Sequence, residues 1–353
     1  MKERYNSIDG LRVISCFGII AMHILANTTY KLSGNFVWDR IIPSWTWFVY
    51  LFLMISGFGM CAGYLERMQK GTISMEEFYK KRYKKILPFF GFLILIAVVM
   101  EHSLSSIFEA SIELPMLHGL LPNNNMSLLG VCWTLGVIFL FYLLFPFFSW
   151  LMKSKKTAWL TLLASLWINF VCDEYFFGEE YVTESFTPRH SFIYCIPLFV
   201  AGGLIYLYRN EIKSFCKKFR WLFLAICVAV TVAWYIVPDS ICGINVFSLE
   251  TLILFCFWLT YAIGVDSKFL SCKFMKFFSG ISMEMYLAQM VIFRVVEKMG
   301  LLYVFGDYGI GGWISFVFAF ILTVAGLVLF IQGFKLAVKI LTKFKDKIIK
   351  NRV

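Results

Sequence analysis

The sequence predicts an all-α integral membrane protein, a bundle of about ten transmembrane helices with both termini in the cytoplasm. Three observations lead to this fold class. Hydrophobic residues make up 60% of the 353 residues and charged residues only 16%, which is more apolar sequence than a soluble core absorbs. Apolar runs of membrane-spanning length recur along the chain. Lysine and arginine gather in alternate segments between these runs.

We expect ten spans, at residues 7–27, 45–65, 87–105, 128–151, 157–174, 191–208, 220–238, 244–264, 274–298 and 313–341. With the N-terminus inside, 27 of the 33 Lys and Arg residues fall on one side of the membrane. They occupy the N-terminus, the segments 66–86, 152–156, 209–220 and 265–276, and the chain from Lys335. The opposite side has only Lys31, Arg40, Arg189 and Lys298. One missed span would destroy this alternation, so it supports both the orientation and the span count.

The first span is apolar but contains Asp9, Arg12 and His23. A charge in the middle of a span costs roughly 2.5–3.5 kcal/mol, and Asp9 and Arg12, at i and i+3, can meet on one face near the helix end. Arg12 and His23 are eleven residues apart, about three turns, so they point the same way about 16 Å apart. An ion-paired helix end plus a buried structural histidine would produce the same spacing. We expect this stretch to be retained, because it is too long and too polar on one face for a cleavable signal.

We expect one membrane domain, residues 1–342, and a basic cytoplasmic tail, residues 343–353, that lies against anionic lipid head groups. The net charge of +11 does not indicate nucleic-acid binding, because the basic residues lie between spans. The ten cysteines form no CxxC pair or metal-type spacing, so we expect no metal site. A disulfide between Cys172 and Cys242 stays open.

The most basic internal segment, residues 77–88, leads into the third span. Most of its charges fit positive-inside anchors, but Arg82 and Lys85 share one helix face. Two cations there suit a polyphosphate such as the nucleotide part of coenzyme A, which arginine binds by a fork and lysine as a point charge.

Further ionisable residues lie inside or beside spans. We expect Glu250 to orient the His23 ring, with a structural ion pair as the alternative. Glu284 could pair with Arg12, and Arg294 with Glu297 at i and i+3. Among the other histidines, His102 falls at the end of the third span, whereas His118 and His190 lie in or beside external loops, where a solvated role is the default.

Several short motifs follow one another in a characteristic order. They are Ile8-Asp9-Gly10-Leu11-Arg12 with His23, Ser56-Gly57-Phe58, Arg82-x-x-Lys85 before Ile86-Leu87-Pro88, Trp133-Thr134-Leu135, Tyr142-Leu143-Leu144-Phe145-Pro146, and Gly280-Ile281-Ser282 running to Tyr286-Leu287-Ala288-Gln289. In this order, and over nearly the whole chain, the sequence resembles the acyltransferase family 3 integral-membrane enzymes. Two positions depart from the family pattern: Lys85 stands where the family has Arg, and Gln289 where it often has His.

The resemblance implies an enzyme that moves an acyl group, usually acetyl, from cytoplasmic acyl-coenzyme A to a hydroxyl of a carbohydrate. The implied partners are membrane lipids and a carbohydrate or lipid-linked glycan of the cell envelope, and the implied location is a bacterial plasma (inner) membrane. Acetyl-coenzyme A would be the co-substrate, bound by Arg82, Lys85 and Arg12. Trp133, Tyr142, Ser282, Tyr286 and Gln289 lie in family motifs and would line the substrate tunnel.

The chemistry favours the same residues. Acyl transfer from a thioester to an alcohol needs a base for the hydroxyl proton and a donor for the developing oxyanion. His23 is the only histidine well inside a span, and its ordinary pKa leaves it mostly neutral. We therefore expect His23 to be the base, with Arg12, Asp9 and Glu250 beside it in the catalytic site.

Two other functions compete with this enzyme. A transporter or flippase of a lipid-linked or small acidic substrate also has intramembrane charges, but the paired Gly/Pro interruptions typical of transporters are poorly developed here. A non-catalytic relative would explain Gln289, which can form hydrogen bonds but cannot move a proton.

Overall fold

The computed structural model describes residues 4–121, 128–178, 180–182, 186–236 and 249–350, with side chains described as far as residue 344. The chain is 81% helical. Within the described ranges there is no strand, and the only bridge outside strands joins Lys31 to Tyr308. The prediction of an all-α protein is therefore confirmed. Cys242 and residues 122–127, in one of the predicted external loops, lie outside these ranges.

The chain is a multi-pass membrane protein. Among the described residues, six helices are long and apolar enough to cross a membrane: Ser7–Ala26, Val37–Gln69, Met75–Glu101, Trp133–Leu151, Arg209–Ile236 and Gly309–Phe344. Two apolar helices are shorter, Phe192–Leu207 and Leu249–Gly264. Each expected span overlaps an α-helix, but ten membrane crossings and cytoplasmic termini stay predictions.

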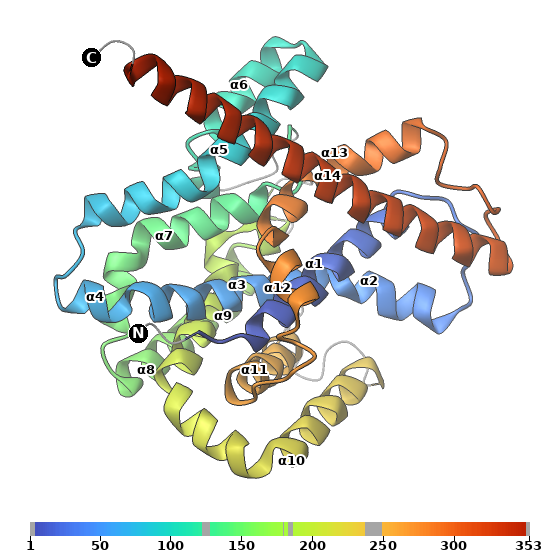
Figure 1. Cartoon of the computed structure of the whole chain (residues 1–353). Helices are drawn as coiled ribbons and strands as arrows, with labels where there is room; N and C mark the ends of the chain where they lie inside the picture. The colour runs from blue at the N-terminus through green and yellow to red at the C-terminus, as the bar shows by residue number, and fades with distance from the viewer. Residues whose placement is uncertain (1–3, 122–127, 179, 183–185, 237–248, 351–353) are drawn as a thin grey trace. The chain divides into compact units, whose positions relative to one another are not determined.

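The chain divides into two compact units, residues 1–15 with 46–279 and residues 16–45 with 280–353. The division falls inside α1 (Ser7–Ala26) and inside η2 (Trp45–Trp47). Unit 1 also contains α3 (Phe48–Met60), η3 (Cys61–Leu65), α4 (Glu66–Gln69), α5 (Met75–Glu101), α6 (Leu104–Glu113), η4 (His118–Leu120), α7 (Trp133–Leu151), α8 (Lys155–Tyr175), η5 (Pro188–His190), α9 (Phe192–Leu207), α10 (Arg209–Ile236), α11 (Leu249–Gly264) and α12 (Lys273–Ser279). Unit 2 contains η1 (Val37–Ile41), α2 (Ile42–Ser44), α13 (Ser282–Lys298) and α14 (Gly309–Lys350). Figure 1 draws these elements along the chain.

Helix α5 begins twelve residues before the predicted third span, because the basic segment is itself helical. Ser74 caps its first turn by accepting a hydrogen bond from the Glu77 amide at 3.1 Å, and the acidic residues of that turn suit the positive end of the helix dipole. The helix ends at Glu101, where His102 adopts φ 48° and donates its amide to the Val98 carbonyl at 3.1 Å. The placement of His102 at the end of this helix is confirmed.

Close packing of α3 on α9 depends on two glycines. A Cβ atom at Gly57 would lie 2.2 Å from the carbonyl oxygen of Phe199, and one at Gly202 would lie 2.0 Å from the carbonyl oxygen of Met54. Both clashes are with backbone of the opposite helix, so neither can be relieved by a side-chain rotation. Small residues let membrane helices approach in this way, and α3 is thereby held with its following turn, η3, against the rest of unit 1.

Helix α10 bends within its first half, as Figure 1 shows for the yellow helix. Phe219 has φ −120° and ψ 30°, outside the helical region. The bend separates a basic segment, residues 209–220, from the apolar part that follows. The basic part and the apolar part of α10 therefore have different axis directions (Figure 1).

In unit 2, α13 runs parallel to the second part of α1. The Cys16 thiol donates to the Ser282 carbonyl at 3.6 Å, and eleven residues farther along the chain, directly after α1, the Asn27 side chain accepts from Arg294 at 3.3 Å. Because residue numbers rise together along both helices, the side chains between these contacts meet in order. This register is the basis for placing the predicted residues of unit 2.

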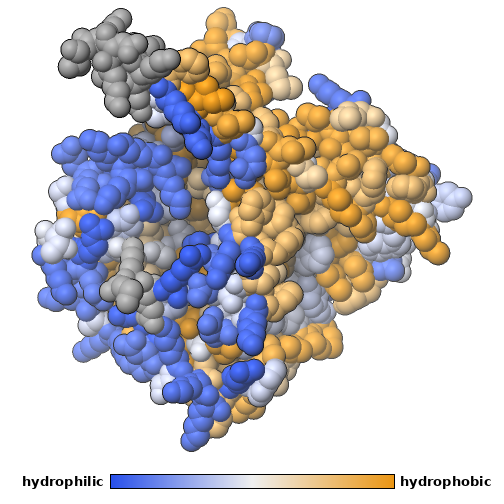
Figure 2. Space-filling model, viewed as in Figure 1, coloured by the Kyte–Doolittle hydropathy of each residue, from blue (hydrophilic) through white to orange (hydrophobic). Residues whose placement is uncertain are grey.

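Helix α14 exposes apolar side chains over a long stretch, among them Ile310, Ile314, Val317, Ile321 and Leu329. Large apolar areas of this kind are visible as orange surface in Figure 2. Their extent is that of a lipid-facing surface, because soluble monomers rarely expose contiguous apolar patches larger than a few hundred Å². The helix continues to Lys350, so the predicted tail begins as an extension of this helix.

Replacing Gly57 with alanine is expected to lower the free energy of unfolding of the detergent-solubilised protein by about 1–3 kcal/mol, the usual cost of overpacking. The melting temperature should fall accordingly. Gly59, two residues away on the same helix, is the matched control, since a Cβ there would meet only the Arg12 guanidinium, at 3.8 Å. Gly59→Ala should be neutral or stabilising, because alanine is the better helix former. Equal melting temperatures for the two variants would show that the close approach of α3 and α9 does not limit stability.

Candidate functional site

Two arginines predicted to act together converge on one tyrosine in unit 1. Tyr142 of α7 lies under the Arg82 guanidinium of α5, 5.5 Å from ring centroid to Cζ. Tyr142 and Asp9 are also the electrostatic neighbours of Arg12 on α1. The structure therefore brings together Arg12, Arg82 and Tyr142, which belong to three different motifs of the sequence.

A second tyrosine, which the sequence analysis missed, holds Arg82 in place. The Tyr64 hydroxyl of η3 accepts a hydrogen bond from Arg82 Nη2, and the Tyr64 ring stacks under the guanidinium at 4.6 Å. Met60 Sδ is 3.8 Å from Arg82 Nη1. Tyr64 precedes Arg82 by eighteen residues across a turn, so no helical spacing signals the contact.

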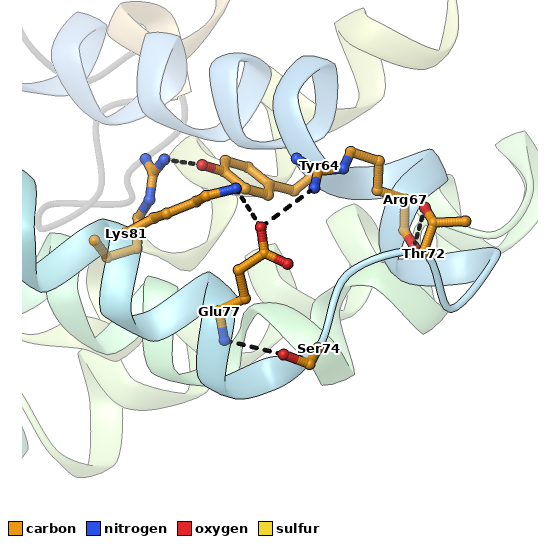
Figure 3. Close-up of polar contacts among 7 residues, drawn as sticks. Tyr64, Arg67, Thr72, Ser74, Glu77 and Lys81 are labelled. Atoms are coloured by element: carbon orange, nitrogen blue, oxygen red, sulfur yellow. Dashed lines mark hydrogen bonds and ion pairs between the residues drawn. The ribbon is translucent and has the colours of Figure 1, made fainter.

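Two other cations near Arg82, Lys81 and Arg67, share one carboxylate (Figure 3). Glu77 accepts from Lys81 at 2.5 Å and lies 3.9 Å from Arg67. Within the part of the chain that the structure describes, Arg82 has no carboxylate partner, and it is half-buried. A half-buried guanidinium without a counter-ion is suited to bind an anion, because the fork of N–H groups fits phosphate and carboxylate oxygens.

The structure places two other predicted site residues, Asp9 and Lys85, differently from what helical spacing suggests. Asp9 accepts from Arg4 at 3.2 Å and from the Ser279 hydroxyl at 2.7 Å, so its ion-pair partner is Arg4 rather than Arg12. Lys85 is exposed, whereas Arg82, one turn earlier, is half-buried. The two predicted phosphate ligands therefore differ in how far they are removed from solvent.

Unit 2 contains the predicted base and three predicted tunnel residues. His23 on α1 is half-buried, and Ser282, Tyr286 and Gln289 lie on α13. The register set by the Cys16–Ser282 and Asn27–Arg294 contacts brings the level of His23 to that of Gln289. Gln289 is 1% exposed, and both polar atoms of its amide lack a hydrogen-bond partner among the described residues.

An unsatisfied buried amide costs about 1–3 kcal/mol, so a ligand that satisfies Gln289 would recover this free energy. An amide can donate to one hydroxyl oxygen and accept from another. Gln289 is thus suited to orient a polyhydroxyl compound, although it cannot transfer a proton.

The three pairings expected for the acidic residues have different outcomes. The predicted pair of Arg294 and Glu297 is confirmed at 2.7 Å. Glu284 lies 3.8 Å from Lys335 of α14, which is a partner the sequence analysis did not consider. Glu250, in the first turn of α11, is half-buried. It belongs to unit 1 and His23 to unit 2, so their pairing stays a prediction.

A group of buried polar residues lies at the start of α7. Glu113 and His118 are fully buried, so the expectation of a solvated His118 is wrong. His118 contacts the Cys132 carbonyl oxygen at 3.0 Å and packs against Gly136, which leaves no room for a Cβ. A buried role was missed because these residues fall in a segment that reads as an external loop.

The other histidine of this region is also held by packing. The His190 ring stacks on Trp133 with centroids 4.2 Å apart, and burial, helped by Arg189, lowers the pKa of His190 to about 3. A histidine with this pKa is neutral at physiological pH. Trp133 is 9% exposed, so at this position the predicted tunnel residue packs against η5.

Comparison with known proteins gives one match. The family model described as an acyltransferase domain matches residues 5–332, nearly the whole chain. No curated protein and no solved structure matches. The match contains every predicted site residue, from Asp9 to Gln289.

Among the described residues, no group of three or more His, Cys, Asp or Glu side chains is placed to bind a metal ion. The predicted site residues thus form two groups, each described within its own unit. The first is Arg12, Arg82, Tyr142 and Tyr64, and the second is His23 with Gln289. Helix α1 contributes to both, through Arg12 and His23.

Burial of Glu113 makes stability depend on pH. Burial raises the pKa of this carboxyl to about 7, although the Cys132 thiol and the Leu129 amide act to lower it. The folded pKa exceeds the unfolded one, so the free energy of unfolding should fall as pH rises from about 4.5 to about 7. The loss is at most roughly 3–4 kcal/mol.

The control is Glu113→Gln, which keeps the shape and cannot titrate. Melting temperatures in detergent from pH 4.5 to 8 should fall more steeply for the unmodified protein than for this variant. Parallel curves would mean that Glu113 is ionised, or equally solvated, in both states.

Proposed function

Since the chain belongs to acyltransferase family 3, we propose that it transfers an acyl group, acetyl in the simplest case, from cytoplasmic acyl-coenzyme A to a hydroxyl of a cell-envelope or exported carbohydrate. The observation that carries this proposal is the convergence of Arg12 and Arg82 on Tyr142. The donor is a polyanion, and Arg82 is a half-buried guanidinium without a carboxylate partner among the described residues.

The two arginines have distinct tasks in this proposal. Arg82, held by Tyr64, binds a phosphate oxygen of the donor through its free N–H groups. Arg12, on α1, supplies a second positive charge that attracts the anionic donor. The Tyr142 ring packs against the Arg82 guanidinium, with 5.5 Å between ring centroid and Cζ, and helps to hold it in position.

The acceptor side of the proposal depends on His23 and Gln289. Neutral His23 takes the proton from the acceptor hydroxyl as its oxygen bonds to the carbonyl carbon. The carbon–sulfur bond then breaks, the coenzyme A sulfur leaves with a proton returned from His23, and the ester remains on the acceptor. The unsatisfied Gln289 amide binds a neighbouring hydroxyl and fixes the orientation of the sugar.

The reaction is tested by incubating the purified full chain with radiolabelled acetyl-coenzyme A and a panel of envelope carbohydrates. Formation of a labelled ester, together with free coenzyme A, supports the enzyme. Uptake of a substrate into vesicles without ester formation would favour a transporter, and binding of the donor without transfer to any acceptor would favour a non-catalytic relative.

Arg82→Ala is expected to raise the apparent KM for the donor more than it lowers kcat, because a contact made equally in ground and transition states sets mainly KM. A lost charge-assisted contact corresponds to about 1.5–3 kcal/mol, or roughly tenfold or more in affinity. Lys84→Ala is the matched control, since Lys84 is an exposed cation on the same helix. A direct titration in which both variants bind donor equally would reduce Arg82 to a topological anchor. Lys85→Ala should have a smaller effect than Arg82→Ala because Lys85 is exposed.

His23→Gln is expected to lower kcat about 100-fold or more, the usual contribution of a general base, while donor binding and melting temperature are kept. Glutamine retains hydrogen bonding but cannot accept the proton. A structural histidine would be rescued by glutamine better than by alanine. Transfer at close to the unmodified rate by His23→Gln would place the base elsewhere.

A further inference from the structure

A basic pocket lies in unit 1, next to the first turn of α1 and apart from the residues assigned above. Its volume is about 510 Å³, within the range of about 300–1,000 Å³ of small-molecule sites. Three segments line it: residues 4–7 before and at the start of α1, residues 213–220 of α10, and residues 262–266 at the end of α11.

Four cations and one carboxylate line this pocket. Lys213, Lys217 and Arg220 come from α10, Arg4 comes from the N-terminal segment, and Asp266 is the one acid. The positions 213, 217 and 220 recur at i, i+4 and i+7, so one face of α10 presents them together. Phe219 interrupts the helix between Lys217 and Arg220, but all three side chains line the same pocket.

The cations are not equally neutralised. Arg4 is paired with Asp9 at 3.2 Å, and Lys213 Nζ lies 4.4 Å above the Tyr5 ring. Within the described part of the chain, neither Lys217 nor Arg220 forms an ion pair. The pocket thus keeps an excess of positive charge, which an anionic ligand would compensate.

The floor of the pocket is held by short contacts. The Ser7 hydroxyl donates to the Val265 carbonyl at 2.8 Å and accepts from the Ser267 amide at 2.9 Å. Gly264 lies against Cys216, where a Cβ would be 2.3 Å from the sulfur. A floor held in this way lowers the ordering cost of binding.

We propose that this pocket binds a phosphate-bearing group, with Lys217 and Arg220 as its principal ligands. Two sources carry this chemistry on the side predicted to be cytoplasmic: the adenosine bisphosphate end of the acyl donor and the head group of an anionic phospholipid. The site itself does not depend on the proposed acyl transfer, whereas the donor as its source rests on that proposed function.

The test uses the full chain in phosphatidylcholine nanodiscs and two probes. Adenosine 3′,5′-bisphosphate, titrated by calorimetry, represents the donor without its acyl group. Replacing one third of the lipid with phosphatidylglycerol, read out as a shift in melting temperature, represents the head group. Since neither probe is acylated, the measurement stands even if the chain transfers no acyl group.

Lys217→Gln and Arg220→Gln are compared with Lys218→Gln. Lys218 is adjacent on α10, outside the pocket, with its Nζ 5.0 Å from the Phe219 ring, and its loss changes the net charge equally. We expect each pocket substitution to weaken bisphosphate binding about tenfold or more and Lys218→Gln to leave it unchanged; this identifies the donor as the source.

The source is the lipid if two results are obtained together. The bisphosphate does not bind, and phosphatidylglycerol stabilises the unmodified protein and the Lys218→Gln variant but does not stabilise the pocket variants. Two results overturn the proposal. One is that neither probe has an effect on the unmodified protein. The other is that the pocket variants and Lys218→Gln respond alike, as expected for a general positive-inside anchor.

Discussion

A charged guanidinium in a membrane-spanning helix needs partners from the protein, and the arrangement of unit 1 around Arg12 meets this constraint. Burying a charge in a span costs roughly 2.5–3.5 kcal/mol, and Arg12 has Asp9 and Tyr142 as its electrostatic neighbours. Tyr142 also packs against Arg82, which Tyr64 holds by a hydrogen bond and by its ring. Four elements, α1, η3, α5 and α7, are thereby tied to one polar cluster inside an otherwise apolar unit.

This cluster depends on how closely the surrounding helices approach. Gly57 and Gly202 allow α3 to contact the backbone of α9, and α3 leads directly into η3, where Tyr64 meets Arg82. Ser56-Gly57-Phe58 is therefore a structural motif in this chain, in which Gly57 sets the helix spacing and Phe58 packs edge-on against Tyr5 at 4.9 Å. Tyr5 in turn lines the basic pocket, so one short stretch of α3 contacts both the arginine cluster and the pocket wall.

The structure separates two kinds of cation that the composition does not distinguish. Some cations are neutralised nearby, as Lys81 and Arg67 are by Glu77 and Arg4 by Asp9. Others, such as Arg82 and Arg220, have no carboxylate partner among the described residues. Both kinds contribute equally to a positive-inside count, but only the second kind is free to attract an anionic ligand.

From its sequence alone, the chain is recognisable as an all-helical membrane protein of this acyltransferase family, and local pairs such as Arg294 with Glu297 follow from helical spacing. These properties depend on residues close in sequence or on an ordered set of motifs. The tertiary structure decided that Asp9 pairs with Arg4 and Ser279, that Tyr64 and Tyr142 hold Arg82, that His118 is buried, and that residues 4–7, 213–220 and 262–266 form one pocket. Spacing on one helix determines which face a side chain shares, whereas its partner and its burial depend on helices brought together by packing from distant parts of the chain.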